Sequence, residues 1–454
     1  MHIHFMGIGG CGVSGLALMA MDRGYSVSGC DILSSGPYYK MVKEKGVPCY
    51  TGHSAGHLKD VDILVRSSAV PENDNEVSTA IEKGTKVYTR GEFLAKLLVN
   101  TPVIGVAGSH GKTTTAWMIY HILKKTGLEP SIYAGGKSGG ITNINASDPV
   151  VVELDESDGT VFEVDPEILL INNLEFEDVD HFKSEEGMRM QFERYLMKRD
   201  KRRLIIGRGY DPGNSLCTLF DALSVPSLDE IREKSGYENT SNHHFSYYDD
   251  KWSMVFNSVE YFAGTIKDAP HILQNRFSAM LASSLYLNLQ GMEMPMMDNA
   301  FWRSIPEIDR RFQVSGTYGG VVLVDDYAHH PTEIAATVQQ AEIEYKNFGL
   351  VFQPHKYTRF NAFYDSFKKV LTIPGPLIIL PVYSAGEKEE GVNSLDLYND
   401  LKETGYSEVY YFPSIEEAGI FLKNNMEKLR ISALVCVGAG DLNSIFSYLK
   451  REQS

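Results

Sequence analysis

The strongest chemical signal in the sequence is the glycine-rich segment GVAGSHGKT at residues 105–113. An apolar strand-like run precedes it and a stretch with helical periodicity follows. Gly108 and Gly111 free backbone N–H groups to cradle phosphate oxygens, while Lys112 offers a cation and Thr113 a hydroxyl for Mg²⁺. The segment is one residue longer than the strict phosphate-loop pattern, but its setting between strand and helix is the required one. We therefore predict a nucleoside triphosphate site.

Acidic side chains follow the next two predicted strands. The run VVELDESD at residues 151–158 places four carboxylates between Glu153 and Asp158. A solvated loop is the usual interpretation of such a run, but divalent ions shared with phosphates are held by one or two carboxylates. Because the phosphate loop lies one strand away, we favour an ion site. The run NNLEFEDVDH at residues 172–181 fits either a second metal site or a capping loop.

A second glycine-rich segment, GIGGCG at residues 7–12, lies between the apolar run HIHFM and a predicted helix. In this setting glycines let the backbone approach a pyrophosphate at a helix N-terminus. Asp31 ends the following strand, where an acid can bind a ribose hydroxyl or a base edge. A dinucleotide, a nucleotide-sugar and a simple tight turn would each fit this pattern.

Histidine and basic side chains gather after two apolar strands in the last third of the chain. They lie in DDYAHHP at residues 325–331 and QPHKYTR at residues 353–359. Open α/β sheets bind ligands at the carboxyl ends of their strands. A single histidine is more often structural, but this convergence favours a site. His329, His330 and His355 are candidates for a catalytic base.

The elements that must position these groups alternate between short apolar strands and helical runs. This rhythm covers the first hundred residues, resumes at Thr101 and returns from residue 320 onward, so it predicts three successive α/β units with parallel strands. Between residues 183 and 268 the signal weakens into charged and polar segments, and little beyond mixed structure can be assigned there.

Composition excludes several classes of protein. The 454 residues are 43% hydrophobic and 22% charged, which supports folded cores. A net charge of −16 argues against gripping nucleic acid by bulk electrostatics. No apolar run approaches the length of a membrane span, and the five cysteines are scattered without a paired motif. We expect a cytoplasmic protein with no nucleic-acid or membrane partner, either a monomer or a homodimer.

Taken together, the motifs resemble those of the Mur ligase family. The resemblance runs from residue 3 to about residue 445 and rests on GIGGCGVSG, GVAGSHGKTTT, VELDESD, HILQN, RRF, VDDYAHHPTEI, VFQPHKYTR and VYSAGE. It implies an N-terminal Rossmann-like domain at residues 1–99 that binds UDP-N-acetylmuramate. A central P-loop ATPase-like domain with a mixed sheet, residues 100–314, would bind ATP with Mg²⁺ or Mn²⁺, and a C-terminal Rossmann-like domain, residues 315–454, the amino acid.

The implied activity is ATP-dependent ligation in peptidoglycan precursor synthesis. ATP would phosphorylate the muramate carboxylate, and an amine, L-alanine in the branch that the last two motifs resemble, would displace phosphate to form an amide. The run NNLEF is more similar to ligases of cell-wall recycling, which attach a preformed tripeptide to the same nucleotide-sugar. An NAD-dependent oxidoreductase would leave the phosphate loop unexplained, and a non-catalytic nucleotide sensor would not need the retained reactive side chains.

The resemblance also assigns residues. Catalytic roles fall on Lys112, Glu153, His329 and His355, and metal binding on Thr113, Glu153 and His181, with Asp178 as the alternative to His181. ATP contacts fall on Gly108, Ser109, His110, Gly111, Lys112, Thr113, Thr114, Asn275, Arg311 and Asp326. UDP-sugar contacts fall on Gly9, Gly10, Gly12, Asp31, Ser67 and Ser68. Amino-acid contacts fall on Tyr327, His329, His355, Lys356 and Arg359.

Overall fold

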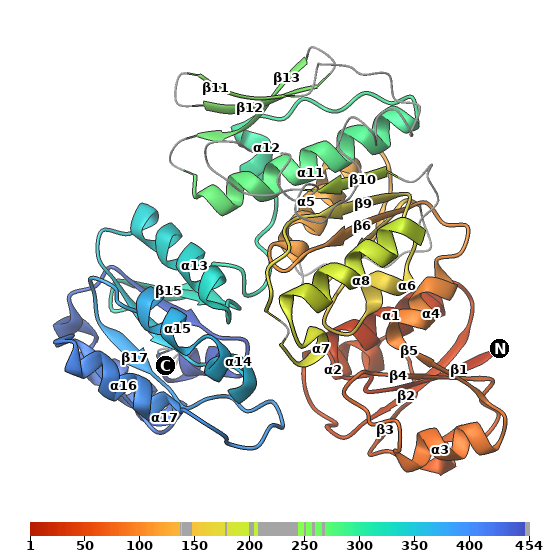
Figure 1. Ribbon diagram of the computed structural model, residues 1–454, viewed down its shortest axis with the longest axis horizontal. Helices are drawn as coiled ribbons and strands as arrows, with labels where there is room; N and C mark the ends of the chain where they lie inside the picture. The colour runs from red at the N-terminus through yellow and green to blue at the C-terminus, as the bar shows by residue number, and fades with distance from the viewer. Residues whose placement is uncertain are drawn as a thin grey trace.

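Three α/β lobes follow one another along the chain in the computed structural model (Figure 1). The N-terminal lobe is coloured red to orange, the central lobe orange through yellow to green and the C-terminal lobe teal to blue. The structure describes residues 1–136, 138, 148–177, 179–198, 204–207, 244–248, 251–256, 259–265 and 268–449.

The N-terminal sheet is parallel, with strand order β3-β2-β1-β4-β5. Its strands are β1 His2–Met6, β2 Ser26–Asp31, β3 Cys49–Thr51, β4 Ile63–Arg66 and β5 Lys86–Thr89, and its helices are α1 Cys11–Asp22, α2 Pro37–Glu44, η1 Ala55–Leu58, α3 Asn75–Glu82 and α4 Arg90–Leu97. Alternate residues of β1 face opposite sides. Ile3 and Phe5 pack into the core beneath α1 and α4, whereas Met6 packs with Leu58 and Val77 on the side of η1 and α3.

The central lobe combines a parallel sheet, order β10-β9-β6-β8-β7, with a separate antiparallel sheet, β11-β12-β13. The strands are β6 Val103–Ala107, β7 Ser131–Tyr133, β8 Val150–Glu153, β9 Ile168–Ile171, β10 Leu204–Gly207, β11 His244–Tyr248, β12 Lys251–Phe256 and β13 Val259–Thr265. The helices are α5 Lys112–Lys125, α6 Thr160–Glu163, α7 Val179–Phe182, α8 Glu185–Lys198, α11 Pro270–Leu289 and α12 Asn299–Ser304. Trp117 of α5 and Phe277 of α11 share one apolar core with Val106 of β6, so α5 is fixed directly behind the strand it follows.

The C-terminal sheet has the order β14-β15-β19-β16-β17-β18, and only the edge strand β14 runs antiparallel to its neighbour. The strands are β14 Gln313–Tyr318, β15 Val321–Asp326, β16 Phe348–Phe352, β17 Leu377–Ile379, β18 Val409–Tyr411 and β19 Ala433–Val437. The helical elements are α13 Pro331–Glu344, α14 Tyr357–Ala362, α15 Tyr364–Val370, α16 Ser394–Glu403, α17 Ile415–Asn425, η2 Met426–Leu429, η3 Leu442–Ile445 and α18 Phe446–Leu449. The strands β15 and β16 are hydrogen-bonded to the same neighbour, β19, so the two predicted histidine segments leave the same edge of the sheet.

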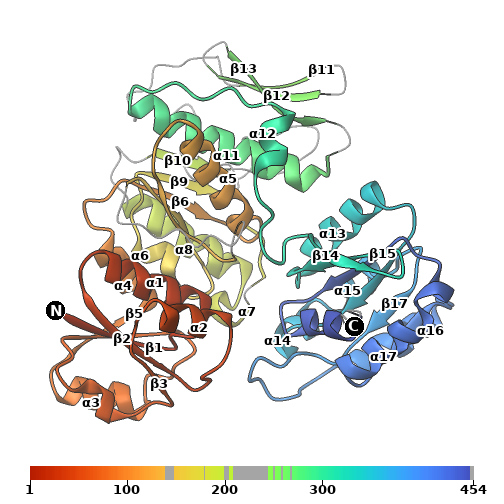
Figure 2. The same cartoon turned by 180° about the vertical axis from the view of Figure 1, so that it is seen from behind.

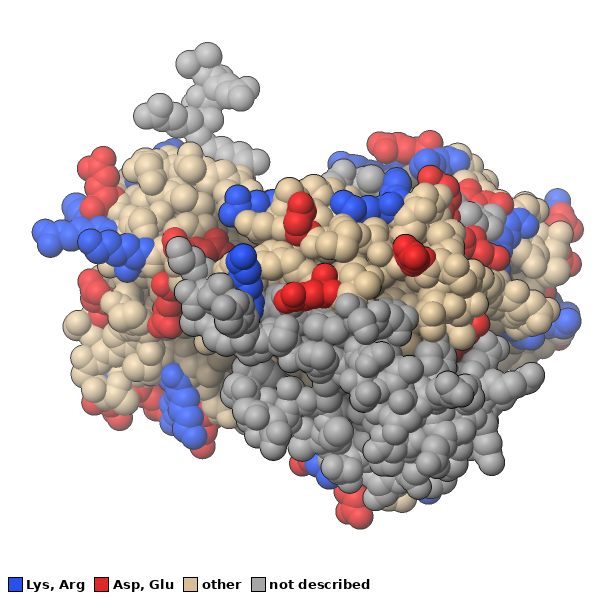
Figure 3. Space-filling view, turned by 90° about the horizontal axis from the view of Figure 1, so that it is seen from above, with Lys and Arg blue, Asp and Glu red and all other residues tan. Residues whose placement is uncertain are grey.

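The chain crosses from the central to the C-terminal lobe between α12 and β14, as the view from behind shows (Figure 2). Arg310 and Phe312 in this connection have positive φ angles of 58° and 49°. On the face seen from above, acidic and basic side chains are interspersed over the described surface (Figure 3). None of the described helices is both long and apolar enough to cross a lipid bilayer.

Candidate active site

A cleft of about 1000 Å³ opens where the three lobes meet, and residues of every lobe line it. The N-terminal lobe contributes Cys11, Gly12 and Arg90, the central lobe Thr113, Tyr133 and Glu153, the connection between lobes Arg310 and Arg311, and the C-terminal lobe Asp325 and Tyr327. The cleft therefore brings side chains from the first, second and third predicted units into one volume.

The phosphate loop has a backbone that requires glycine at two positions. Gly108 has a φ of +116°, and a Cβ there would lie 2.6 Å from the carbonyl oxygen of Asn173. Gly111 has a φ of +77° and packs against the side chain of Asn275, which also accepts a 3.3 Å hydrogen bond from Thr115. Because α5 begins at the next residue, its free N–H groups face the loop. The geometry is that of an anion site at a helix N-terminus.

Lys112, which lies in this loop, contacts the buried carboxyl group of Glu156. Its ammonium donates to Glu156 at 3.0 Å and to the carbonyl of Ser109 at 3.2 Å. Burial alone would lower the pKa of Lys112, but Glu156 and Asp155 outweigh it and raise the pKa. Burial raises the pKa of Glu156 to about 8, and its second oxygen has no hydrogen-bond partner among the described residues. The lysine is thus kept charged beside an incompletely satisfied carboxylate.

Oxygen ligands suitable for a hard divalent ion meet at the next residue. The hydroxyl of Thr113 lies 3.0 Å from both carboxylate oxygens of Glu153, and the backbone N–H of Gly135 donates to the same carboxylate at 2.7 Å. Arg311 reaches back from the connection between lobes and donates to the Thr113 hydroxyl at 3.2 Å. A carboxylate and a hydroxyl beside a phosphate loop fit Mg²⁺, which is usually held by one or two carboxylates together with substrate phosphates.

His110 joins the central and C-terminal lobes. Its ring nitrogens lie 2.9 Å from Glu175 and 3.3 Å from Glu333 of α13, and its ring stacks on His330 with the centroids 5.3 Å apart. Burial would lower the pKa of His110, but the two carboxylates outweigh it and raise the pKa to about 10. Thr332 adds a hydrogen bond to Glu175 at 2.6 Å. A charged imidazolium therefore holds α13 against the phosphate loop.

The histidines expected to act as bases are neutral. Burial lowers the pKa of His329 to about 3, and its Nδ1 lies 3.0 Å from the carbonyl oxygen of Tyr327. Burial, followed by the charges of Arg359 and Lys356, lowers the pKa of His355 to about 4. The rings of His329 and His355 lie 5.8 Å apart, and His355 stacks on Tyr383. The two predicted strand-end segments therefore converge.

The first glycine segment forms a tight turn tied to β2. The backbone N–H of Gly9 donates to the Asp31 carboxylate at 2.8 Å, and a Cβ at Gly9 would lie 2.9 Å from the same oxygen. A Cβ at Gly7 would lie 2.8 Å from that of Ser67, which ties this turn to the end of β4. Of this predicted set, Gly12 lines the cleft, whereas Gly9, Gly10, Asp31, Ser67 and Ser68 lie outside its lining.

Ser109, Thr114 and Asp326, which were also predicted, lie outside the lining of the cleft. The Ser109 hydroxyl donates to the carbonyl of Glu175 at 2.8 Å, and Thr114 lies in the first turn of α5. The Asp326 carboxylate accepts from the backbone of Phe312 at 2.7 Å, so it ties the connection between lobes to β15.

Lys356, Arg359 and His181 also lie outside the lining of the cleft. Lys356 is the N-cap of α14, a helix that includes Arg359. The Nε2 of His181, on α7, is buried without a hydrogen-bond partner among the described residues. Asp178 lies outside the described residues. The choice between His181 and Asp178 as a metal ligand therefore stays a prediction.

Several site residues were not singled out by the sequence. Arg90 donates to Asp158 at 2.8 Å and to the hydroxyl of Tyr133 at 3.1 Å, and Tyr133 in turn donates to the carbonyl of Gly12 at 2.8 Å. These contacts link the N-terminal and central lobes in the cleft. Glu156 lay within the predicted acidic run, but nothing distinguished it from its neighbours there.

Comparisons with known proteins agree with these motifs. The chain matches the Mur ligase family, catalytic domain, over residues 2–101, and the Mur ligase, glutamate ligase domain, over residues 310–440. A UDP-N-acetylmuramate–L-alanine ligase from Desulfatibacillum aliphaticivorans is 32% identical over 449 residues, which cover 97% of this chain and 96% of that protein. One from Sulfurihydrogenibium sp. (strain YO3AOP1) is 31% identical over 467 residues, covering 99% and 97%.

Two solved structures show the same fold. The UDP-N-acetylmuramate-alanine ligase of Thermotoga maritima has a TM-score of 0.73 at 22% identity, covering 99% of this chain and 98% of that one. A murein peptide ligase from Psychrobacter arcticus has a TM-score of 0.68 at 19% identity, covering both chains completely. The chain belongs to the Mur ligase family, an assignment that confirms the family and the three-domain α/β fold predicted from its motifs. It is accordingly an ATP-dependent ligase.

Proposed function

We propose that this protein joins L-alanine to the carboxylate of UDP-N-acetylmuramate at the expense of ATP, as a step of peptidoglycan precursor synthesis. The observation that carries the proposal is the cleft whose lining combines Gly12, Thr113 and Tyr327 from three different lobes. A nucleotide-sugar at the first, phosphates at the second and an amino acid at the third would meet there. The full-length relatives described above are named for this reaction.

The phosphate loop would activate the acid. A carboxylate and a γ-phosphate are both anionic, and two unit charges about 4 Å apart repel by roughly 4 kcal/mol at an effective dielectric of about 20. Lys112 would leave Glu156 for the phosphates and reduce this repulsion, while Arg311 would approach them from the connection between lobes. Thr113 and Glu153 would hold Mg²⁺, which when bound supplies the remaining positive charge. The product of this step is an acyl phosphate and ADP.

The C-terminal lobe would present the amine. Arg359 carries the positive charge suited to the amino acid carboxylate, and its charge acts on the imidazoles of His329 and His355. Attack by the uncharged amine on the acyl carbon forms a tetrahedral intermediate, which expels phosphate and leaves the amide. We expect the reaction to take place in the cytoplasm.

The proposal is tested by measuring phosphate release with all three substrates present and with each of the three left out in turn. The protein with Mg²⁺, ATP, UDP-N-acetylmuramate and L-alanine should release phosphate and form a product heavier by one alanyl residue, and omission of any one substrate should abolish both. The tripeptide L-alanyl-γ-D-glutamyl-meso-diaminopimelate, offered in equimolar competition, should give little product. Preferential use of the tripeptide would refute the proposed acceptor, and absence of any amide product would refute the ligase itself.

A further inference from the structure

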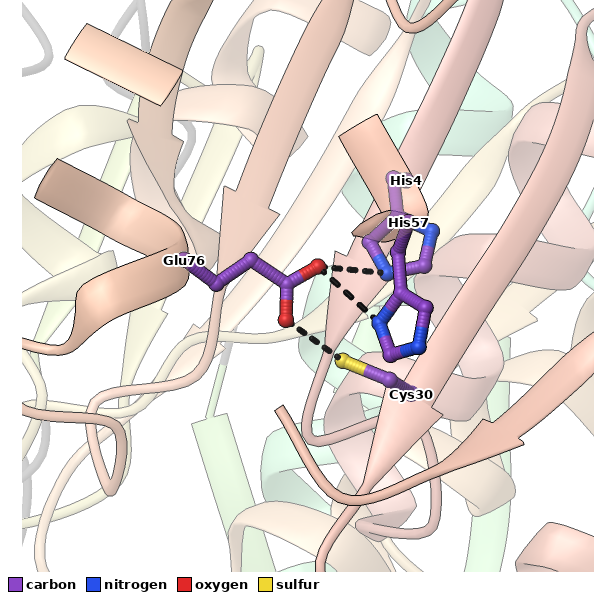
Figure 4. Close-up of side chains that lie close together, drawn as sticks. All are labelled: His4, Cys30, His57 and Glu76. Atoms are coloured by element: carbon purple, nitrogen blue, oxygen red, sulfur yellow. Dashed lines mark hydrogen bonds and ion pairs between the residues drawn. The ribbon is translucent and has the colours of Figure 1, made fainter. Parts of the chain in front are cut away.

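Four side chains of metal-binding type converge on the face of the N-terminal sheet away from α1. They are His4 of β1, Cys30 of β2, His57 of η1 and Glu76 of α3, and their ligand atoms all lie within 4.8 Å of one another (Figure 4). His4, Cys30 and Glu76 are completely buried, and 14% of the His57 side chain is exposed. None of the four lines the cleft, so the proposed ligation reaction does not use this cluster.

The spacing of the cluster already approximates a coordination shell. Glu76 Oε1 lies 3.2 Å from His4 Nε2 and 3.2 Å from His57 Nδ1, and Cys30 Sγ lies 3.5 Å from Glu76 Oε2. A tetrahedral ion with bonds of about 2.0–2.3 Å holds its ligand atoms about 3.3–3.8 Å apart. These three separations are close to that range, and the other ligand atoms would have to approach one another from within 4.8 Å.

One contact in the cluster joins a buried imidazole to a buried carboxylate. His4 Nε2 lies 3.2 Å from Glu76 Oε1, and this contact opposes the lowering of the His4 pKa by burial. The ordinary interpretation of a buried histidine and glutamate is a hydrogen-bonded core pair. A metal ion would replace this contact by two metal–ligand bonds.

Outer contacts orient the ligands. The other ring nitrogen of His4 is 2.8 Å from the Ser28 hydroxyl, which fixes the ring so that Nε2 faces the cluster. The backbone N–H of Ser54 donates to Glu76 at 2.8 Å. Metal-binding histidines and carboxylates are usually fixed by such second contacts. Tyr50 stacks on His57 with the centroids 4.6 Å apart and covers the partly exposed ring.

We propose that His4, Cys30, His57 and Glu76 bind one Zn²⁺ ion in a closed structural site. A thiolate, a carboxylate and two neutral imidazoles carry two negative charges, which balance the dication in a buried place. Binding forms one metal–sulfur, one metal–oxygen and two metal–nitrogen bonds, and releases the thiol proton to solvent, with no change of oxidation state. The ion would join β1, β2, η1 and α3, four elements that are otherwise held on this face by a small apolar core.

Titration with Co²⁺ provides the test, since a thiolate bound to Co²⁺ gives a charge-transfer band and a tetrahedral site gives strong visible absorption. The full-length protein, stripped with a chelator and kept in excess Mg²⁺ to occupy hard-ion sites, should bind one equivalent of Co²⁺ with both features, and Zn²⁺ should displace it. Cys30→Ser should abolish the thiolate band. Cys49→Ser, a change of another cysteine in the same lobe, and Cys11→Ser, a change within the cleft, should each retain it.

Affinity and stability give independent readouts. Ser28→Ala should weaken Zn²⁺ binding by about 10- to 100-fold, the usual effect of losing an outer contact. Zn²⁺ should raise the melting temperature of the wild type and Cys49→Ser but not that of Cys30→Ser, while the metal-free melting temperatures show whether each variant is folded. Wild-type protein without the thiolate band, or Cys30→Ser with the same band and the same Zn²⁺ affinity, would overturn the proposal.

Discussion

The contact between Lys112 and Glu156 allows a sharp test of the phosphate site. The Lys112 ammonium lies 3.0 Å from a carboxyl oxygen of Glu156, and because burial raises the pKa of Glu156 to about 8, this contact near neutral pH is a charge-assisted hydrogen bond rather than a pair of full charges. A polyphosphate that draws Lys112 away must offer an interaction of similar size. Loss of one preorganised donor to a reacting oxyanion costs about 10²–10³-fold in kcat. Because Lys112 is also charged, we expect Lys112→Met to lower phosphate release by about 10³-fold or more.

The same substitution should change the pH dependence of stability. The pKa of Glu156 is already raised by burial from 4.5 to about 8, and removal of the neighbouring ammonium raises it further. Below pH 4.5 the carboxyl group is protonated in both states and costs nothing. Above it the unfolded state ionises while the folded state does not, so stability falls by about 1.4 kcal/mol per pH unit. The wild type already has this slope up to about pH 8, so the variant should differ from it above pH 8, where its stability should continue to fall.

The measurements are steady-state phosphate release, calorimetric binding of UDP-N-acetylmuramate, and urea unfolding at several pH values. Lys125→Met, a change of an exposed lysine at the other end of α5, is the matched control and should leave release and binding unchanged. The double variant Lys112→Met with Glu156→Gln should remove the additional pH dependence. Near-normal phosphate release would refute the role of Lys112, and simultaneous loss of UDP-sugar binding would refute the proposed division of labour between lobes.

Three further outcomes are expected. Arg311→Ala should lower kcat about 10²–10³-fold without changing UDP-sugar affinity, whereas Arg303→Ala, at an exposed position of α12, should change neither. Equal effects of the two substitutions in kinetic assays would contradict a specific role of Arg311 at Thr113. His110→Gln should have a lower free energy of unfolding than wild type, and this difference should be greatest between about pH 5 and 6.5 and disappear as the pH rises through about 10. Thermal unfolding across this range measures the difference, which would be constant if His110 were uncharged. The His355 imidazole, with a pKa lowered to about 4, should not titrate above pH 6 in NMR spectra of the free protein, and should titrate near neutrality only when a stable acyl-phosphate analogue and the amino acid are both bound.

The elements with strong local patterns were predictable, and α8 shows why one was missed. The segment VIGVA forms β6 and the run after the phosphate loop forms α5. Both were predictable because the spacing of apolar residues within each segment indicates a strand or a helix. α8 lies in the segment left unassigned because most of its residues are polar. Among the α8 side chains that the structure describes, the buried ones are nevertheless Met188, Phe192, Tyr195 and Leu196, which have the spacing i, i+4, i+7 and i+8 of one helix face. A count of that spacing would have found it.

The contacts between lobes could not be found in this way. His110 and Glu333 are separated by 223 positions, and Arg90 and Asp158 by 68. No local period relates such residues, because their proximity depends on how whole lobes pack. The sequence could therefore name chemically capable groups at strand ends, but could not show that Glu156, rather than another acid of the same run, is the partner of Lys112.

The low pKa values of the histidines in the C-terminal lobe bear on the order of steps in the proposed ligation reaction. An imidazole with a pKa near 4 would take a proton from an ammonium group only at a cost of about 5 kcal/mol or more, since the ammonium pKa lies at least about 4 units higher. One negative charge brought to about 4 Å contributes roughly 4 kcal/mol, or about 3 pKa units, at an effective dielectric of about 20. The acyl phosphate would supply such a charge, and an amino acid carboxylate bound to Arg359 would offset the cation that now lowers the pKa of His355. His355 would thus become an effective base only after the acid has been activated and the amino acid is seated, which couples deprotonation of the amine to the presence of its electrophile.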